Sequence, residues 1–257
     1  MKPLLEVDGL SVRFGGLLAV DRVSLRVGTG EVVGLIGPNG GGKTSCIDAL
    51  TGFVPLAAGQ TRFAGRRIDD LPPHRRARLG LIRTFQSLDL FDDLSVRENL
   101  LVAANRPSWW TPLVDAVLPQ RRPDHDIDWA LEAVGLIDAA ERRPSELANG
   151  PRHLLALARA IVGRPQLLLL DEPAAGLDTS ETATLGARLR ELPARGISVL
   201  LVDHDMGLVM SVCETVYVLD FGTIIASGPP AQIRANANVV RAYLGEGTTA
   251  CGDGRSV

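Results

Sequence analysis

The sequence contains few aromatic residues and few cysteines, and it has no long apolar run. Phe, Trp and Tyr make up 4% of the 257 residues, so aliphatic side chains must form most of a core. The three cysteines, Cys46, Cys213 and Cys251, are odd in number and scattered, which predicts neither a disulfide framework nor a zinc site. No apolar run approaches the roughly 18 residues of a membrane-spanning helix, and the first residues lack the apolar stretch of a secretory signal. We therefore expect a soluble, reduced protein.

The sequence also lacks an excess of charge of one sign. It has 27 basic and 30 acidic residues, a net charge of −3, which argues against a nucleic-acid partner. Hydrophobic residues make up 46% of the chain, enough for a packed core, so disorder is excluded as its main state. Of the 27 basic residues only Lys2 and Lys43 are lysines, and the other 25 are arginines. A lysine within so arginine-rich a chain suggests that a guanidinium would not fit at position 43.

The spacing of apolar residues predicts an α/β protein. Residues 4–27 are predicted to form short antiparallel strands. Residues 87–163 are predicted to be mostly helical, and beyond residue 165 apolar strands alternate with amphipathic helices, a pattern typical of a parallel sheet covered on both faces. The expected strands are 31–36, 166–170, 198–202 and 215–219, and the expected helices are 43–50, 96–104, 127–134, 151–162, 180–192 and 206–213.

A glycine-rich segment separates the expected strand at 31–36 from the expected helix after it. It reads Gly37-Pro38-Asn39-Gly40-Gly41-Gly42-Lys43-Thr44-Ser45 and fits the phosphate-loop pattern G-x-x-x-x-G-K-[ST]. Glycines let successive backbone N–H groups point inward around an anion, and the helix adds its positive N-terminal end. In such a loop Lys43 spans the β- and γ-phosphates and the Thr44 hydroxyl binds Mg²⁺. The segment predicts a site for a nucleoside triphosphate with Mg²⁺.

Two carboxylates end a second apolar strand, Leu167-Leu168-Leu169-Leu170-Asp171-Glu172. Ligand sites of open α/β sheets lie at the carboxyl ends of strands. Because adjacent strand residues point to opposite faces, we expect different roles for the two. Asp171 suits Mg²⁺ coordination through water, and Glu172 suits the general base that polarises an attacking water. For the pair taken alone, a helix N-cap or a solvated acidic pair is the alternative.

Together these motifs resemble the ATPase subunits of ABC transporters over nearly the whole chain. Arg83-Thr84-Phe85-Gln86 resembles the family's Q-loop, Ala175-Gly176-Leu177-Asp178 its D-loop and Val202-Asp203-His204-Asp205 its switch region. The resemblance implies ATP as the nucleotide, Gln86 near Mg²⁺ and the transmembrane partner, His204 at the γ-phosphate, Asp178 in the nucleotide site and Phe14 stacked on adenine. Taken singly, Gln86 is an ordinary polar residue, His204 is more often structural, and Phe14 is more often a core residue.

The chain departs from that family at the signature, which is usually Leu-Ser-Gly-Gly-Gln at the start of a helix. Here the segment is Leu147-Ala148-Asn149-Gly150-Pro151. In the family this segment binds the ATP held by the partner subunit. Ala148 lacks the hydroxyl that donates to the γ-phosphate, so we expect Ala148, Asn149 and Gly150 to form a weakened site. The alternative is that Gly150 and the backbone N–H groups suffice.

Residues 171–177 and 239–246 resemble one subclass, the ATPases of importers for branched-chain amino acids or for related urea and amides, and residues 204–210 support it. This implies two permease subunits, a second ATPase subunit, an extracytoplasmic solute-binding protein and a peripheral position on the cytoplasmic face of the membrane. A heterodimer of ATPase subunits is favoured over a homodimer. A soluble ABC ATPase switch, a regulatory nucleotide-binding subunit and an export ATPase of the lipopolysaccharide type are the alternatives.

The implied fold is α/β, with a RecA-like phosphate-loop core, an N-terminal antiparallel β-subdomain and a helical subdomain inserted at about 87–163. Residues 1–246 would form the ATP-binding domain and residues 247–257 a disordered tail. Trp109 and Trp110 lie in a proline-rich stretch at 105–123. Packing within the helical subdomain and contact with a partner both stay open for them.

Overall fold

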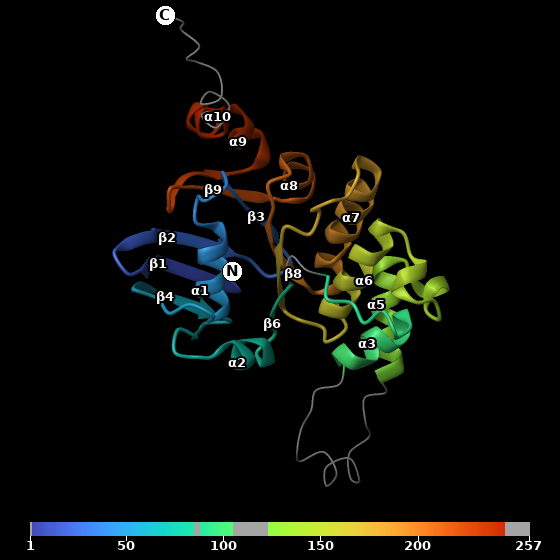
Figure 1. The fold of residues 1–257 in the computed structure, drawn as a ribbon. Helices are drawn as coiled ribbons and strands as arrows, with labels where there is room; N and C mark the ends of the chain where they lie inside the picture. The colour runs from blue at the N-terminus through green and yellow to red at the C-terminus, as the bar shows by residue number, and fades with distance from the viewer. Residues whose placement is uncertain (1, 85–87, 105–122, 245–257) are drawn as a thin grey trace, which may run out of the picture.

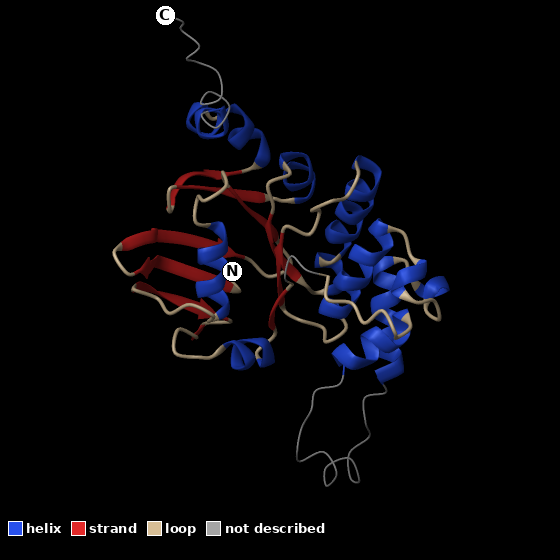
Figure 2. Cartoon of the chain, viewed as in Figure 1, coloured by secondary structure: helices blue, strands red, loops and turns tan. Residues whose placement is uncertain are grey.

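The structure, a computed structural model, describes residues 2–84, 88–104 and 123–244. Figure 2 shows its strands gathered in two sheets, with one group of helices packed to one side and the other helices beside and above the sheets. The strands are β1 (Leu5–Phe14), β2 (Leu17–Val27), β3 (Val32–Ile36), β4 (Ala58–Phe63), β5 (Arg66–Arg67), β6 (Leu81–Arg83), β7 (Leu167–Asp171), β8 (Ser198–Val202), β9 (Thr215–Asp220) and β10 (Thr223–Gly228). The α-helices are α1 (Lys43–Thr51), α2 (Pro73–Arg78), α3 (Val96–Ala104), α5 (Pro123–Val134), α6 (Asn149–Ile161), α7 (Thr179–Glu191), α8 (Met206–Val212), α9 (Pro230–Ala235) and α10 (Ala237–Leu244), with 3₁₀ turns η1 (Ile137–Ala139), η2 (Pro144–Glu146) and η3 (Pro193–Arg195).

The central sheet has the strand order β10-β9-β3-β8-β7-β6. Its strands are parallel from β9 to β6, and β10 pairs antiparallel with β9 at one edge. The second sheet, β2-β1-β4-β5, is antiparallel. In Figure 1 helix α1 stands between the two sheets, while α6 and α7 lie on the opposite side of the central sheet.

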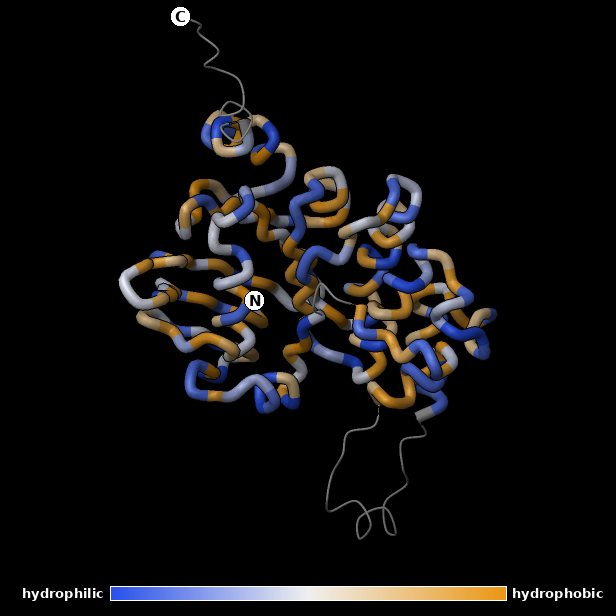
Figure 3. The backbone as a smooth tube through the Cα atoms, viewed as in Figure 1, coloured by the Kyte–Doolittle hydropathy of each residue, from blue (hydrophilic) through white to orange (hydrophobic). Residues whose placement is uncertain are grey.

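The apolar strands of the central sheet separate two hydrophobic clusters. On β7, Leu168 and Leu170 belong to the cluster with the helices α5, α6 and α7, whereas Leu167 and Leu169 belong to the cluster with α1 and the antiparallel sheet. Figure 3 shows this hydrophobic centre along the middle strands. Because both faces are covered, these strands need continuous apolar runs rather than alternation.

The sequence-based elements after the phosphate loop agree closely with the structure. The expected helix at 96–104 and strand at 198–202 coincide with α3 and β8. The expectation of an α/β protein with an N-terminal antiparallel sheet is confirmed. The prediction of a parallel sheet was incomplete, because β10 pairs antiparallel with β9 at one edge and was not predicted from the sequence.

Helices α3, α5 and α6 contact one another and form the helical part of the chain. The boundaries of a helical subdomain at about 87–163 stay a prediction, and the expected tail at 247–257, with Trp109 and Trp110, lies outside the described residues. No helix within the described ranges has the length and apolar character needed to cross a bilayer.

A buried arginine joins α2 to the end of α1. The Arg76 side chain donates to the carbonyls of Ala49 and Leu50 (2.8 Å each), Leu71 (2.8 Å) and Asp69 (2.9 Å). The carbonyls at the end of a helix have no partner within the helix. Arg76 therefore supplies hydrogen-bond donors to carbonyl groups at the C-terminal end of α1, the helix that follows the phosphate loop.

Replacement of Arg76 by Met should destabilise the protein by about 3 kcal/mol, because buried carbonyl groups would lose their donors. Urea unfolding followed by circular dichroism would measure the change. The matched control is Arg75→Met on the same helix, whose side chain is exposed and whose loss should change the unfolding free energy by no more than about 0.5 kcal/mol. Equal unfolding midpoints for the two variants would contradict this role for Arg76.

Candidate functional site

The loop between β3 and α1 has the backbone shape of an anion cradle. Gly40 and Gly42 adopt φ of 75° and 99°, and Gly42 is the N-cap of α1. A Cβ atom at Gly42 would lie 2.6 Å from the carbonyl oxygen of Ala19, and one at Gly37 would lie 1.9 Å from that of Leu219. A larger residue at Gly37 or Gly42 would therefore displace the loop, and the positive φ values with a helix N-terminus directly after them are typical of a phosphate-binding loop.

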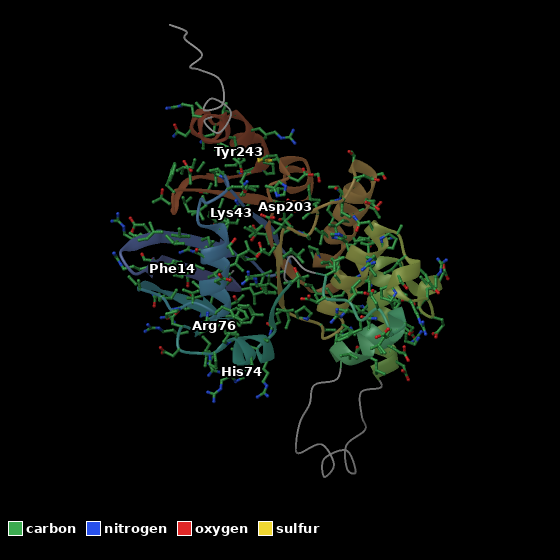
Figure 4. All side chains as sticks on the ribbon, in the orientation of Figure 1. Phe14, Lys43, His74, Arg76, Asp203 and Tyr243 are labelled. Atoms are coloured by element: carbon green, nitrogen blue, oxygen red, sulfur yellow. The ribbon has the colours of Figure 1, made fainter. Side chains whose placement is uncertain are left out.

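Lys43 lies at the first position of α1 and folds its side chain back over the loop. Its ammonium donates to the carbonyls of Gly37 (2.7 Å) and Pro38 (2.9 Å) and is buried. Thr44 is exposed beside it, and Ser45 is half-buried. Figure 4 shows Lys43 near the loop-proximal end of α1. The ammonium is thus held over the loop by the Gly37 and Pro38 carbonyls.

Asp171, the last residue of β7, is buried and lies on the α1 side of the sheet. Its Oδ2 accepts a hydrogen bond of 2.9 Å from Arg83, which also binds Asp48 of α1. Burial raises the pKa of Asp171, and the Arg83 guanidinium offsets part of that effect. Its Oδ1 is buried and has no hydrogen-bond partner among the described residues. A buried carboxylate oxygen left without a donor fits a hydrated cation such as Mg²⁺.

Glu172 follows Asp171 and points elsewhere, because its φ of 49° ends the strand. Its Oε2 lies 3.8 Å from Nδ1 of His204, an exposed residue after β8. Asp203, beside His204, is fully buried and accepts hydrogen bonds from the backbone N–H groups of Asp205 (2.9 Å) and Ala174 (3.3 Å). Burial raises the pKa of Asp203, and those N–H donors counteract the shift. Asp203 therefore fixes the backbone on both sides of the Glu172–His204 pair.

A pocket of about 400 Å³ lies between the phosphate loop and the turn from β1 to β2. Lys43, Thr44, Ser45 and Glu172 line it together with Phe14, whose side chain is 47% exposed at the end of β1. Its size is within the ordinary range for small-molecule sites. The pocket thus brings together Lys43, predicted to bind phosphate, Phe14, predicted to stack on adenine, and Glu172, predicted to be the general base.

Asp178 and the signature residues lie apart from that pocket. Asp178 is the N-cap of α7, and its carboxylate accepts from the N–H groups of Ser180 (2.7 Å) and Glu181 (2.8 Å). The Glu181 N–H group, followed by the Ser180 hydroxyl and N–H, lowers the pKa of Asp178. This capping role could not be inferred from the D-loop resemblance.

The signature segment begins α6 and is joined to the Asp178 region. Ala148 is the exposed N-cap and supplies no side-chain acceptor. The Asn149 amide donates to the Gly176 carbonyl (2.8 Å), and the Gly150 N–H donates to Oε1 of Glu181 (2.7 Å). The N–H group expected to serve a ligand thus already binds a carboxylate of the same chain.

Gln86, predicted near Mg²⁺, lies outside the described residues. Sequence reasoning also gave no role to Arg83, Glu181 or Phe221, all of which border or support the site. Arg83 belongs to the segment that resembles the Q-loop and Glu181 to no motif, but the sequence indicates the partners of neither residue, because those partners are set by the tertiary structure. Phe221 had one usable signal, since aromatic residues are rare in this chain.

Comparisons with known proteins agree with this geometry. The family model described as "ABC transporter" matches residues 20–175, and that of "Branched-chain amino acid ATP-binding cassette transporter" matches residues 223–248. The chain belongs to the ABC transporter family of ATP-binding proteins. It is therefore a nucleotide-binding ATPase of the kind that drives transport.

The particular relatives are named for one kind of solute. The high-affinity branched-chain amino acid transport ATP-binding protein LivG of Salmonella typhimurium is 44% identical over 252 residues, covering 95% of this chain and 99% of the relative. BraF of Pseudomonas aeruginosa, described in the same words, has the same identity and coverage. The ADP conformation of MJ1267, an ATP-binding cassette of an ABC transporter, superposes with a TM-score of 0.85 at 28% identity, covering 95% of this chain and 100% of the other.

Proposed function

We propose that this chain is the ATP-binding and hydrolysing subunit of an importer for branched-chain amino acids or related small amides. The observation that carries the proposal is one pocket that contains the phosphate loop, Lys43 and Glu172, with Asp171 buried at the end of β7. The match at residues 223–248 and the names of the relatives support this solute class over lipopolysaccharide export.

The binding half of the mechanism uses the loop and α1. Backbone N–H groups at the end of the glycine-rich loop and the start of α1, together with the Lys43 ammonium, hold the phosphates, because the loop places Lys43 beside the helix N-terminus. Phe14, which lines the same pocket, stacks on the adenine base. Thr44, Asp171 and Gln86 would hold Mg²⁺, which would supply positive charge to neutralise the transferred phosphoryl group.

The hydrolytic half uses the residues after β7 and β8. Glu172 accepts the proton of the attacking water as the general base. His204 donates a hydrogen bond to the γ-phosphate. Its Nδ1 lies 3.8 Å from Oε2 of Glu172, so the two side chains are neighbours in the site. Asp203 holds the segment that carries His204 through the Asp205 N–H group. Phosphate binding is thus assigned to the loop after β3, and proton transfer to Glu172 after β7.

The signature residues serve the ATP of a second subunit, with a heterodimer favoured. Ala148, Asn149 and Gly150 do not line the pocket that contains this chain's Lys43, which suits a role toward another subunit. Their anion site is weak in this chain for two reasons. Ala148 has no hydroxyl, and the Glu181 carboxylate on the Gly150 N–H group repels an approaching phosphate. Asp178 supports the same region as the N-cap of α7.

The rest of the assembly follows from the subclass. Two permease subunits bind the chain at the cytoplasmic face of the membrane, where it is a peripheral subunit, and a solute-binding protein acts on the outer side. Residues 1–246 form the ATP-binding domain, with the helices between about 87 and 163 as an inserted subdomain. The contacts among α3, α5 and α6 support this division.

Replacement of Glu172 by Gln should leave ATP binding intact and slow hydrolysis about a hundred-fold or more, because the water loses its general base. Phosphate release and equilibrium ATP binding would be measured on the same preparation. Glu132→Gln, an exposed position on α5, is the matched control and should keep wild-type turnover. Wild-type turnover in Glu172→Gln would assign the general base to another residue.

The weak signature should make the two ATP sites of a heterodimer unequal. The site on this chain's phosphate loop faces the partner's signature and is competent, whereas the partner's ATP faces Ala148 and is not. In a homodimer both sites are impaired. Joint replacement Ala148→Ser and Pro151→Gln should therefore accelerate hydrolysis by the chain alone roughly ten-fold, since a donor to phosphate is restored.

The same double variant should change a heterodimer with its partner ATPase little, because that assembly already has one complete site. Steady-state ATPase rates of the chain alone and of the co-purified pair would test both statements. A fast wild-type homodimer whose rate the double variant leaves unchanged would show that Gly150 and the helix N-terminus suffice.

A further inference from the structure

Phe221 occupies an unfavourable place in the fold. It lies in the turn between β9 and β10 with φ of 41°, a left-handed conformation that is unfavourable for a bulky side chain. The residue is also 89% exposed, so burial of its ring within this chain contributes almost no free energy to offset the unfavourable backbone conformation. Neither local geometry nor core packing accounts for a phenyl ring at this position.

The turn that carries Phe221 is fixed to the phosphate loop. The Gly222 N–H group donates to the Gly41 carbonyl (3.0 Å), and the Gly222 carbonyl accepts from the Asp21 N–H group (2.8 Å) on β2. A Cβ atom at Gly222 would lie 2.6 Å from the Ala19 carbonyl oxygen, so the approach is as close as a glycine permits. The backbone of Phe221 is therefore held relative to the cradle, as an element of a binding site should be.

The ring borders the same pocket of about 400 Å³ as Phe14. The lining of that pocket is mixed: Lys43 and Thr44 are polar, whereas Phe14, Leu17 and Phe221 are apolar. Leu17 is 67% exposed and Phe14 47%, so the apolar part of the lining is accessible to a ligand. Such a pocket fits a ligand with an anionic end and a flat aromatic end.

Phe221 also borders a larger hollow of about 780 Å³, toward Asn238 and Arg241 of α10. That hollow includes Pro38, Asn39, Gly40 and Gly41 of the phosphate loop but not Lys43 or Thr44. The smaller pocket is the one that Lys43 and Thr44 line together with both aromatic rings. For a nucleotide whose phosphates contact Lys43, we therefore expect the base in the smaller pocket, beside Phe14 and Phe221.

We propose that Phe221 is a second aromatic surface for the purine base of the nucleotide, acting with Phe14. The proposal rests on the proposed function, since it takes the phosphate loop as the site of the triphosphate. Stacking on aromatic side chains contributes to affinity without reading the edge of the base. Phe221 accordingly strengthens binding of purine nucleotides as a class rather than selecting one base.

The test compares a nucleotide with an anion that has no base. Phe221→Asn removes the ring and suits the left-handed turn, because asparagine adopts that conformation readily, so the variant should fold at least as stably as the wild type. Calorimetry on the full chain should show ATP affinity reduced about five-fold or more, as expected for loss of one stacking contact. Affinity for inorganic tripolyphosphate should stay unchanged.

Two further variants complete the design. Phe221→Tyr keeps an aromatic ring and should retain ATP affinity to within about two-fold of the wild type. Phe91→Ala removes another partly exposed ring, on a segment that does not line the pocket, and should leave ATP affinity unaltered.

Three results would overturn the proposal. They are wild-type ATP affinity in Phe221→Asn, an equal loss for ATP and tripolyphosphate, and a loss that appears only when other subunits are present. The last would make the ring an interface residue. Lys43→Ala separates these results from failure of the proposed function, because it should weaken both ligands, and retained affinity there would contradict the phosphate site itself.

Discussion

The site depends on a backbone approach that only glycine allows. The phosphate loop passes so close to the end of β9 and to β2 that a Cβ atom at Gly37 would lie 1.9 Å from the Leu219 carbonyl oxygen. Gly222 meets the Ala19 carbonyl in the same way from the turn after β9. Three segments distant in the sequence therefore converge on one pocket. Without that approach Phe14, Phe221 and Lys43 could not line it together.

The architecture could be predicted wherever burial alone determines an element. Strand β8 and helix α3 match their predicted residues because long apolar runs and helical periodicity need no further information. Elements held by tertiary pairing were missed. Strand β6 has only three residues and exists through its pairing with β7, and β10 is a half-exposed edge paired with β9 alone. Their local sequence gives too weak a preference.

The two carboxylates after the leucine run show the same division within the site. Strand alternation predicted that Asp171 and Glu172 differ, and the structure does place one toward Arg83 and the other toward His204. The cause is different, because β7 ends at Asp171 and the φ of 49° at Glu172 turns the chain away. Which groups they meet does not follow, because Arg83 and Asp48 come from other elements. The same division applies to the signature segment. The sequence alone shows that Ala148 lacks a hydroxyl, whereas only the structure shows that the Gly150 N–H group donates to the Glu181 carboxylate.

The proposed function requires that the phosphate loop of this chain holds ATP through Lys43. The most direct measurement is ATP affinity, by calorimetry, of Lys43→Ala beside Lys2→Ala, which replaces the chain's other lysine. We predict that Lys43→Ala weakens binding about a hundred-fold or more, because a charge-assisted contact to phosphate is lost in a buried setting, while Lys2→Ala binds as the wild type does. ATP affinity retained in Lys43→Ala would show that the phosphates of ATP do not bind at this loop through Lys43.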